Sequence, residues 1–423
     1  MGEHSRRDLL RTGGAALAGA FGLPSLAAAV QAASSPYRRP KLKITDIRTA
    51  EVRVHGHQTH VRVYTDQGIF GQGECTDAAV GSAAIIQRVF RRFLINQDPL
   101  NIDFLFERLR TMGIFGGAQA GQYVTALTGV EIALWDLAGK ALGLPVYQLL
   151  GGKMRDRIRI YCDSAHHHKE DPKTSESLQW VKDQGFTIVK MDCDNAMNPY
   201  RWDRVNWTAN NQEIDMMVEE VRFVRESFPR SVQLCVDAHG RFDVPTGKRL
   251  AKEFEQFDLL FFEEPVPAEY VPAMRDIRES TSTPICCGEN RYLRQGFVDI
   301  LEQHAADVVM PDIQKCGGLL ESRKIADLAH SYYIPVAPHC VVSPIGTMGS
   351  VHVCAAIPNF IALEWHWMPH FDLWKGWVKE GNILKNGFID VTDTPGLGVT
   401  MNEEVARSRQ VPGTPWFEEW KTD

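Results

Sequence analysis

Three acidic residues recur at one interval in the middle of the chain, and each follows a short apolar run. Asp237, Glu263 and Glu289 lie 26 residues apart. The runs before them are 232–236, 259–262 and 284–288. A strand, its covering helix and two loops take a similar length in a βα unit. The interval therefore predicts three neighbouring parallel strands with the carboxylates at one height, which in a (β/α) barrel is the C-terminal rim where active sites lie.

Carboxylates gathered at one rim suit a hard cation. Mg²⁺ takes oxygen ligands in near-octahedral geometry, and three acidic side chains supply such oxygens. Strand-end acids also form turns or cap helices, so the interval alone leaves that second interpretation open. The residues that flank them favour one Mg²⁺ per subunit, held by Asp237, Glu263 and Glu289.

The rhythm of strand and helix continues from about residue 156. Apolar segments alternate with helical stretches, which predicts an α/β fold with a parallel TIM-type barrel over 156–381. The expected strands are Ile158–Cys162, Thr187–Met191, Val232–Val236, Leu259–Phe262, Pro284–Cys287, Asp307–Met310, Ile334–Ala337 and Phe360–Leu363.

Residues 41–155 have a different pattern. An antiparallel meander over about 44–74 precedes a series of helices. The best-defined helix is 122–142, which has one apolar face and ends at Gly143. We expect an α+β domain outside the barrel here. The segment 382–423 holds no further βα unit, and we expect it to return to this first domain.

The first 33 residues have the composition of an export signal. Arg6 and Arg7 precede an apolar, Ala- and Gly-rich stretch over 12–30, and small residues follow it. This pattern is typical of a twin-arginine signal over 1–33, and its glycines and Pro24 make it too weakly apolar for a membrane span. We therefore expect contact with the twin-arginine export machinery, a periplasmic mature protein and no membrane in the mature form.

Charge and cysteine content exclude other classes. The net charge of −7 argues against a nucleic-acid partner, which would need a basic face. The nine cysteines form no C-x-x-C pair, which argues against a zinc ribbon or redox motif. A protein exported in its folded form would keep them as small buried hydrophobes, so we expect no obligatory disulfide.

Two basic residues lie at the same predicted rim. His239 follows Asp237 by two positions, and residues i and i+2 of an extended segment share a face. Lys190 ends the second expected strand. Each is common on ordinary protein surfaces, as a loop histidine or as a solvated lysine at a strand end. Their position beside the carboxylates favours catalytic roles for both.

The last strands of the barrel contribute a pair of the general-base type. Asp312 ends the sixth expected strand and His339 the seventh, so they are neighbours at the rim. A carboxylate beside an imidazole fixes its tautomer and raises its basicity. Glu364 closes the eighth strand. With a metal-bound substrate carboxylate, a base at His339 and an acid at His239, we expect proton removal at C2 and loss of a 3-hydroxyl as water.

Two histidine groups could instead suggest a zinc site. His55 and His57 precede the barrel, and His166–His168 lack spaced carboxylate partners. Neither group has the ligand spacing of a zinc hydrolase. His166 follows the first expected strand and is a candidate for contact with substrate from the rim.

The motifs resemble those of the enolase superfamily, in its mandelate-racemase-like branch, over nearly all of 41–400. They are Val130–Lys140, Leu144–Gly152, Phe262-Glu-Glu-Pro265, Cys287-Gly-Glu-Asn290 and Gly317-Gly318. The resemblance implies a capping domain over 41–155 above a modified (β/α)₇β barrel, completed by 382–423. Within the branch, the chain looks most like acid-sugar dehydratases of the galactonate dehydratase type.

The resemblance also implies a role for each rim residue. The metal ligands would be Asp237, Glu263 (the first of two adjacent glutamates) and Glu289. The base would be His339 with Asp312, the acid His239, and Glu364 would hydrogen-bond the enediolate. Lys190 would bind the substrate carboxylate. The candidate substrate-binding residues are Lys190, Asp192, Arg241 and His166. We expect a small acid sugar as substrate and a homo-oligomer.

Racemases of this branch carry Lys-x-Lys at the second strand, whereas Asp192 stands here at the second lysine position. A two-base racemase of that design is therefore disfavoured. Three functions stay open: an Mg²⁺-dependent sugar-acid dehydratase, a racemase, epimerase or cycloisomerase of the same fold, and a periplasmic sugar-acid binding protein without catalysis. The complete set of acid, base and ligand residues favours the first.

Overall fold

A computed structural model describes residues 39–54, 56–76, 78–164, 171–194, 198–201, 203, 205–366 and 371–419. Leu42–Asp423 forms one compact unit. The expected export signal at 1–33, His55 and His166–His168 lie outside the described residues. Within the described ranges, we find no helix with the length and apolar character that crossing a membrane requires.

The unit begins with an antiparallel sheet. Its strands are β1 (Ile44–Val52), β2 (Gln58–Thr65) and β3 (Phe70–Thr76), paired in the order β1-β2-β3. The helices that follow are α3 (Ser82–Ile85), the π-helix η1 (Ile86–Phe90), α4 (Arg91–Leu94), α5 (Ile102–Met112), the 3₁₀ helix η2 (Ile114–Gly116), α6 (Gln122–Leu142) and α7 (Val146–Leu149). The sheet and its helices form the α+β domain that the sequence predicts.

Helix α6 has the bounds that its periodicity predicts. Leu134 and Leu137 on its apolar face are buried, and the helix ends at Gly143, whose φ of 69° is left-handed. Strand β3 crosses this helix at close range. A Cβ atom on Gly73 would lie 2.3 Å from the carbonyl oxygen of Gly129, so only glycine permits the contact.

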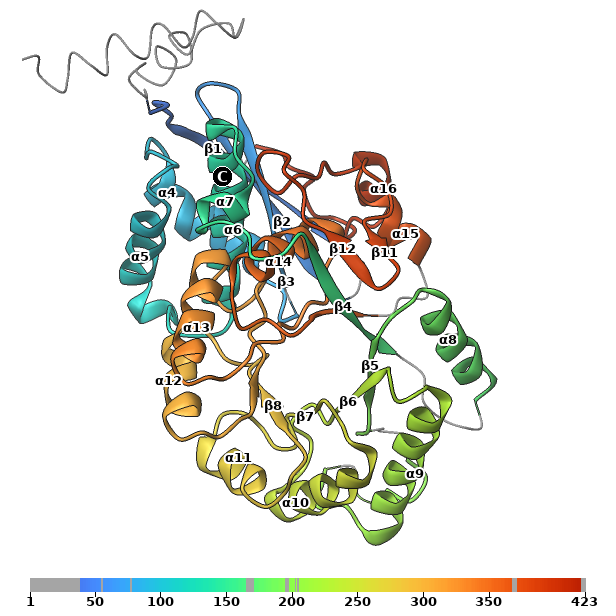
Figure 1. Cartoon of the computed structure of the whole chain (residues 1–423). Coiled ribbons are helices and arrows are strands. Elements are labelled where there is room, and N and C mark those ends of the chain that lie inside the picture. The colour runs from blue at the N-terminus through green and yellow to red at the C-terminus, as the bar shows by residue number, and fades with distance from the viewer. Residues whose placement is uncertain are drawn as a thin grey trace, which may run out of the picture. The chain divides into compact units, whose positions relative to one another are not determined.

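The second half forms the barrel (Figure 1). Its strands are β4 (Arg157–Ser164), β5 (Ile188–Asp192), β6 (Gln233–Asp237), β7 (Phe261–Glu263), β8 (Ile285–Cys287), β9 (Val308–Val309) and β10 (Leu363–His366). Neighbours from β4 to β9 pair in parallel, and β10 pairs in parallel with β4, which closes the ring. The helices are α8 (Pro172–Asp183), α9 (Asn211–Ser227), α10 (Val244–Glu253), the 3₁₀ helix η3 (Phe254–Phe257), α11 (Val271–Arg278), α12 (Gln295–Glu302), α13 (Leu319–Ser331), α14 (Pro344–Ala356) and α15 (Phe371–Gly376).

The seventh expected strand, Ile334–Ala337, is reduced to isolated bridges. Val336 pairs in parallel with Val309 on one side and with Phe360 on the other. Pro335 and Pro338 flank this position. Proline has no N–H to donate to a ladder, so a continuous strand cannot form here.

Cysteines fill part of the barrel interior. Cys235 and Cys286 lie in a buried layer with Tyr161, Phe261 and Met310 below the rim. All nine cysteines of the chain are described, and each is buried with a free thiol. They act here as small apolar side chains, as the sequence predicts.

The C-terminal segment contacts both halves. Its elements are β11 (Leu384–Lys385), β12 (Phe388–Asp390) and α16 (Glu403–Arg407). β12 pairs antiparallel with β4 of the barrel, a contact that the sequence did not predict. Further on, Trp416 bridges Ala50 of β1, within the first domain.

A buried glutamate of α6 joins the two halves. The carboxylate of Glu131 accepts hydrogen bonds from the backbone N–H groups of Leu319, at 2.8 Å, and Leu320, at 3.1 Å, at the start of α13. A helix N-terminus has unpaired N–H groups and favours negative charge. Burial raises the pKa of Glu131 to about 7.

Strand β3 makes an equivalent contact with α14. Glu74 accepts from the backbone N–H groups of Ser343 and Gly346, each at 2.9 Å, and also from the Ser343 hydroxyl. Burial raises its pKa to about 7. Two carboxylates of the first domain thus hold the helices that follow the sixth and seventh strand positions of the barrel.

Replacing Glu131 with alanine should lower the free energy of unfolding by about 2–3 kcal/mol, because buried N–H groups lose their acceptor. Urea denaturation followed by circular dichroism measures the change. Glu302→Ala, at an exposed position of α12, is the matched control and should have little effect. Equal stability of the two variants would contradict the capping role.

Candidate active site

The three spaced carboxylates follow three neighbouring strands. Asp237 ends β6 and Glu263 ends β7, and the two residues pair in register. Glu289 lies two residues beyond β8, which pairs with β7. Asp237 and Glu263 are buried, whereas Glu289 is half-buried. The interval in the sequence therefore places the three at one end of the barrel.

The adjacent glutamates at the end of β7, Glu263 and Glu264, have different contacts. Glu263 faces the ammonium group of Lys190, with Oε2 at 3.0 Å from Nζ. Glu264 has a positive φ of 31° and its carboxylate accepts from the Gly288 backbone N–H and the Asn290 side chain. It therefore holds the loop after β8, which leaves Glu263 as the inward carboxylate of the two.

Lys190 lies at the centre of the acidic group. Its Nζ atom is 2.7 Å from Glu364, 2.9 Å from Asp237, 3.0 Å from Glu263 and 3.6 Å from Asp163. Burial alone would lower the pKa of Lys190, but these carboxylates, Asp237 foremost, raise it well above its usual range. Its expected contact with a substrate carboxylate stays a prediction.

One ammonium group cannot balance this many carboxylates. Oε1 of Glu263 is buried and has no hydrogen-bond partner among the described residues. Burial, together with the charge of Asp237, raises the Glu263 pKa well above its usual range. An acidic site with an unpartnered buried oxygen can hold a metal cation.

His339 and Asp312 meet as the sequence predicts. Their backbones form a parallel bridge, and Nδ1 of His339 lies 2.9 Å from Oδ2 of Asp312. Nε2 points to the acidic group, 3.1 Å from Glu289 and 3.6 Å from Glu364. Burial alone would lower the pKa of His339, but Glu364, Glu289 and Asp312 raise it to about 9.

His239 reaches the site by a different route from the predicted one. β6 ends at Asp237, and His239 has a left-handed φ of 46°, so the segment is not extended. The turn still brings Nε2 to 3.6 Å from Oδ2 of Asp237. Nδ1 lies 3.0 Å from Asp194. Burial alone would lower the pKa of His239, but a hydrogen bond to Asp194 and nearby carboxylates raise it to about 10.

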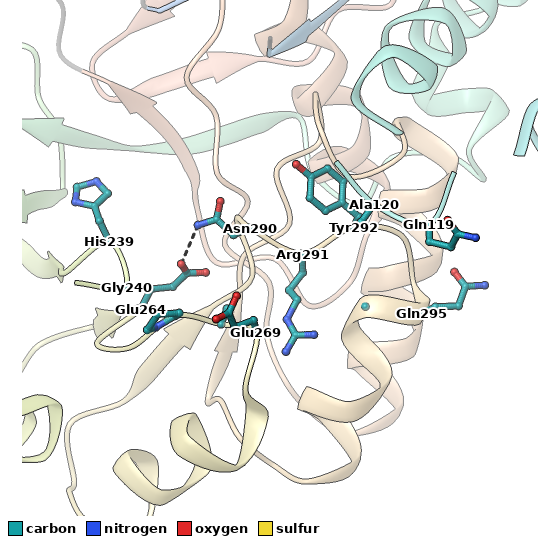
Figure 2. Close-up of a pocket in the computed structure, with 13 residues that line it drawn as sticks. Gln119, Ala120, His239, Gly240, Glu264, Glu269, Asn290, Arg291, Tyr292 and Gln295 are labelled. Atoms are coloured by element: carbon teal, nitrogen blue, oxygen red, sulfur yellow. Dashed lines mark hydrogen bonds between the residues drawn. The ribbon is translucent and has the colours of Figure 1, made fainter. Parts of the chain in front are cut away.

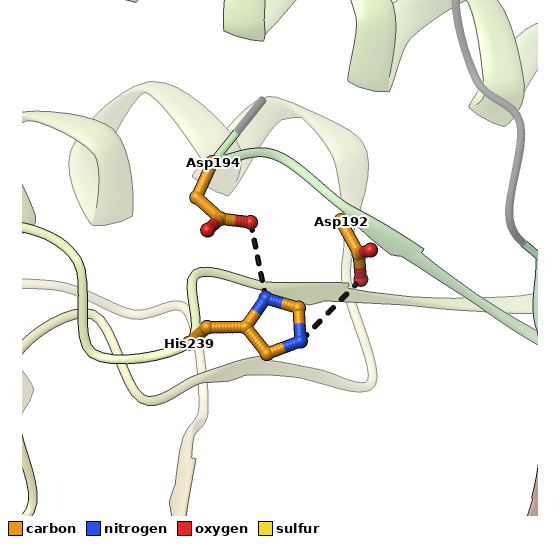
Figure 3. Close-up of side chains that lie close together, drawn as sticks. All are labelled: Asp192, Asp194 and His239. Carbon is orange, nitrogen blue, oxygen red and sulfur yellow. Dashed lines mark hydrogen bonds and ion pairs between the residues drawn. The ribbon is translucent and has the colours of Figure 1, made fainter. Parts of the chain in front are cut away.

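Asp192 lies beside this histidine (Figure 3), and Arg241 lies beside Asp194. Oδ1 of Asp192 is 4.0 Å from Nε2 of His239, and Nε of Arg241 is 3.4 Å from Asp194. Both substrate-binding candidates therefore lie close to His239, Asp192 directly and Arg241 through Asp194. His166, the fourth substrate-binding candidate, lies outside the described residues.

Two rim carboxylates were missed by the sequence. Asp163 follows the first expected strand directly, in the way that Asp237 follows its own. It lies 3.6 Å from Lys190 and 3.6 Å from His366 of β10. Asp194 lies two positions past Asp192. Asp163 could have been identified in the sequence as an acid that follows an expected strand. The contact of Asp194 with His239 is evident only in the folded structure.

A cleft of about 610 Å³ opens beside His239 (Figure 2). His239, Glu264 and Asn290 line it from barrel loops, and Gln119 and Ala120 line it from the first domain. The cleft therefore extends from the rim to the segment between η2 and α6. Residues of both halves shape the approach to the site.

Comparison with known protein families agrees with this architecture. Residues 38–151 match the mandelate racemase/muconate lactonizing enzyme N-terminal domain, and residues 173–405 match the enolase C-terminal domain-like family. The chain belongs to the mandelate racemase/muconate lactonizing enzyme family of the enolase superfamily. The predicted resemblance and the modified TIM-type barrel with its capping domain are confirmed.

Several relatives are named as dehydratases. D-xylonate dehydratase of Haloferax volcanii is 41% identical over 379 residues, covering 89% of this chain and 91% of that protein. D-galactonate dehydratase of Pectobacterium atrosepticum is 32% identical, covering 89% and 96%. A crystal structure of a mandelate racemase/muconate lactonizing enzyme-like protein from Rubrobacter xylanophilus has a TM-score of 0.83 and 41% identity, covering 89% and 99%.

Replacing Lys190 with methionine should destabilise the protein by about 3–5 kcal/mol when no divalent ion is added, because buried carboxylates lose the ammonium group that contacts them. Urea denaturation in a chelating buffer measures the change. The same substitution at the exposed Lys379 should have little effect. A Lys190→Met variant as stable as that control would refute the charge-balancing role.

Proposed function

We propose that the protein is an Mg²⁺-dependent sugar-acid dehydratase that removes the proton at C2 and the hydroxyl at C3 to give a 2-keto-3-deoxy acid. One observation carries this proposal. The carboxylates Asp237, Glu263 and Glu289 form a row, and an imidazole contacts each end of it: His239 beside Asp237 and His339 beside Glu289. A base and an acid on either side of one substrate site suit an elimination.

Asp237, Glu263 and Glu289 would hold the Mg²⁺. The unpartnered oxygen of Glu263 and the excess of carboxylates over ammonium groups support this assignment. When bound, the ion would attract the substrate carboxylate and stabilise the negative charge that develops on it as the C2 proton leaves.

His339 is suited to take the C2 proton. Asp312 accepts a hydrogen bond from Nδ1–H, which leaves Nε2 as the atom that binds the proton. The electron pair of the C2–H bond forms the C2=C3 bond as the C3–O bond breaks. Glu364, 3.6 Å from Nε2 and itself accepting a hydrogen bond from the Cys340 N–H, would hydrogen-bond the enediolate that develops as the C2 proton leaves.

His239 would complete the elimination. Its Nε2–H donates a proton to the leaving hydroxyl, which departs as water. The enol product then gains a proton at C3 and loses the proton of its C2 hydroxyl, which gives the 2-keto acid. Lys190, Asp192, Arg241 and His166 are the proposed substrate-binding residues.

The relatives direct the choice of substrate. The relative at 41% identity is named D-xylonate dehydratase, and relatives at 32% are named D-galactonate dehydratase. Five- and six-carbon aldonic acids, with D-xylonate first, are therefore the substrates to test. We also propose that the protein is exported by the twin-arginine route to the periplasm, on the basis of Arg6, Arg7 and the apolar stretch that follows them.

His339→Asn should reduce dehydration by about 10³-fold or more, because an amide cannot accept the C2 proton as the imidazole would. The assay detects 2-keto-3-deoxy acid from an aldonic acid panel with Mg²⁺. His330→Asn, at an exposed position of α13, is the matched control and should keep the rate. A near-normal rate for His339→Asn would remove the base assignment, and an epimerised acid without loss of water would point to a two-base reaction.

Glu289→Gln should weaken Mg²⁺ binding by at least about tenfold, because a charged oxygen ligand becomes neutral. Isothermal titration calorimetry of the metal-free protein measures the affinity. Glu279→Gln, at an exposed position, should bind Mg²⁺ like the wild type. Unchanged affinity of Glu289→Gln would exclude this residue as a ligand.

A further inference from the structure

A second histidine–aspartate pair lies across the rim from His339 and Asp312. Oδ1 of Asp194 is 3.0 Å from Nδ1 of His239 (Figure 3), and the corresponding distance between His339 and Asp312 is 2.9 Å. In both pairs Nδ1 faces the aspartate and Nε2 faces the acidic group. The two imidazoles are therefore held in the same manner.

The backbone directs His239 toward this partner. Its N–H donates to Oδ1 of Asp237 at 2.7 Å, and its left-handed φ of 46° turns the side chain away from the line of β6. The N–H of Cys193 donates to the carbonyl oxygen of Asp237 at 2.8 Å, which joins the ends of β5 and β6. Asp194 follows Cys193 directly, so this hydrogen bond brings the Asp194 carboxylate close to the His239 imidazole.

Asp194 is itself held on its other side. Nε of Arg241 lies 3.4 Å from Oδ2, while Oδ1 contacts His239. The aspartate side chain is only 14% exposed, compared with 64% for Arg241. The two oxygens of Asp194 thus contact different partners, one the guanidinium and one the ring, which favours one orientation of this carboxylate.

We propose that Asp194 is the positioning residue of the leaving-group acid, fixing His239 with Nε2–H directed at the departing hydroxyl. This inference rests on the proposed function. With Nδ1–H donated to Asp194, Nε2 is the atom that carries the transferable proton. That proton goes to the hydroxyl oxygen as the C3–O bond breaks, and the C2 proton goes to His339. Each half of the elimination then has its own histidine–aspartate pair.

A leaving group that needs no proton distinguishes the positioning role of Asp194 from a structural effect of its substitution. Fluoride departs from C3 as an anion, so a 3-deoxy-3-fluoro analogue of the accepted sugar acid requires the base and the metal but little from the acid. Asp194→Asn should lower kcat for loss of water by about a hundredfold. Fluoride release, followed with a fluoride electrode, should change by less than about threefold.

Matched variants make the comparison specific. Asp203→Asn, at an exposed position of the same loop, should leave both rates unchanged. His239→Asn should show the same separation between hydroxide and fluoride, and the double variant Asp194→Asn/His239→Asn should lose little more than either single variant. Equal loss of both reactions in Asp194→Asn would overturn the inference, since that result indicates a structural role.

A measurement of metal binding tests whether Asp194 is instead a metal ligand. Ligand atoms of Asp192, Asp194 and His239 all lie within 4.8 Å of one another, so a metal role for Asp194 is the rival assignment. Calorimetry with Mg²⁺ should give the same stoichiometry and affinity for Asp194→Asn and wild type, and loss of a bound ion would overturn the inference. If His239→Asn itself shows no separation, the acid assignment in the proposed function fails. If only Asp194→Asn shows none, the inference alone fails.

Discussion

A buried ammonium group among carboxylates is the interaction on which the site depends. Acidic residues of β4, β6, β7 and β10 all approach Nζ of Lys190 within 3.6 Å. Carboxylates gathered in this way repel one another and lose hydration on burial. Lys190 offsets part of that cost from the centre of the rim. The negative charge that remains is what suits the rim to a divalent cation and, through it, to an acidic substrate.

The capping domain holds two helices of the barrel that follow rim loops. Glu131 caps α13, which follows the loop of Asp312, and Glu74 caps α14, which follows the loop of His339. The two loops that carry the proposed base are therefore anchored to buried carboxylates of α6 and β3. Loops are generally more mobile than the strands that they follow. The hydrogen bonds of Glu131 and Glu74 restrict the motion of these two loops. The capping domain thus lines the cleft and also restrains the loops that carry Asp312 and His339.

Strand-end residues were predictable because chain periodicity determines them. The 26-residue interval placed Asp237, Glu263 and Glu289, and the apolar face of 122–142 gave α6 its bounds. Three features required the folded chain. The prolines beside Val336 shorten the seventh strand, the left-handed turn at His239 replaces the expected extended segment, and Asp194 finds its histidine across two strands. Backbone turns and contacts between loops leave no period in a sequence, so pattern alone does not reveal them.

The surroundings of the two imidazoles favour elimination over epimerisation. Epimerisation needs two bases that reach the same carbon from opposite faces, whereas elimination needs a base at one carbon and a proton donor at the next. A lysine at position 192 could serve as a second base, but an aspartate stands there, 4.0 Å from His239. His239 is also the more exposed imidazole, at 36% compared with 14% for His339, and it borders the cleft. The proposed acid, His239, thus lies beside the cleft through which the water formed would leave, while the proposed base, His339, is more enclosed.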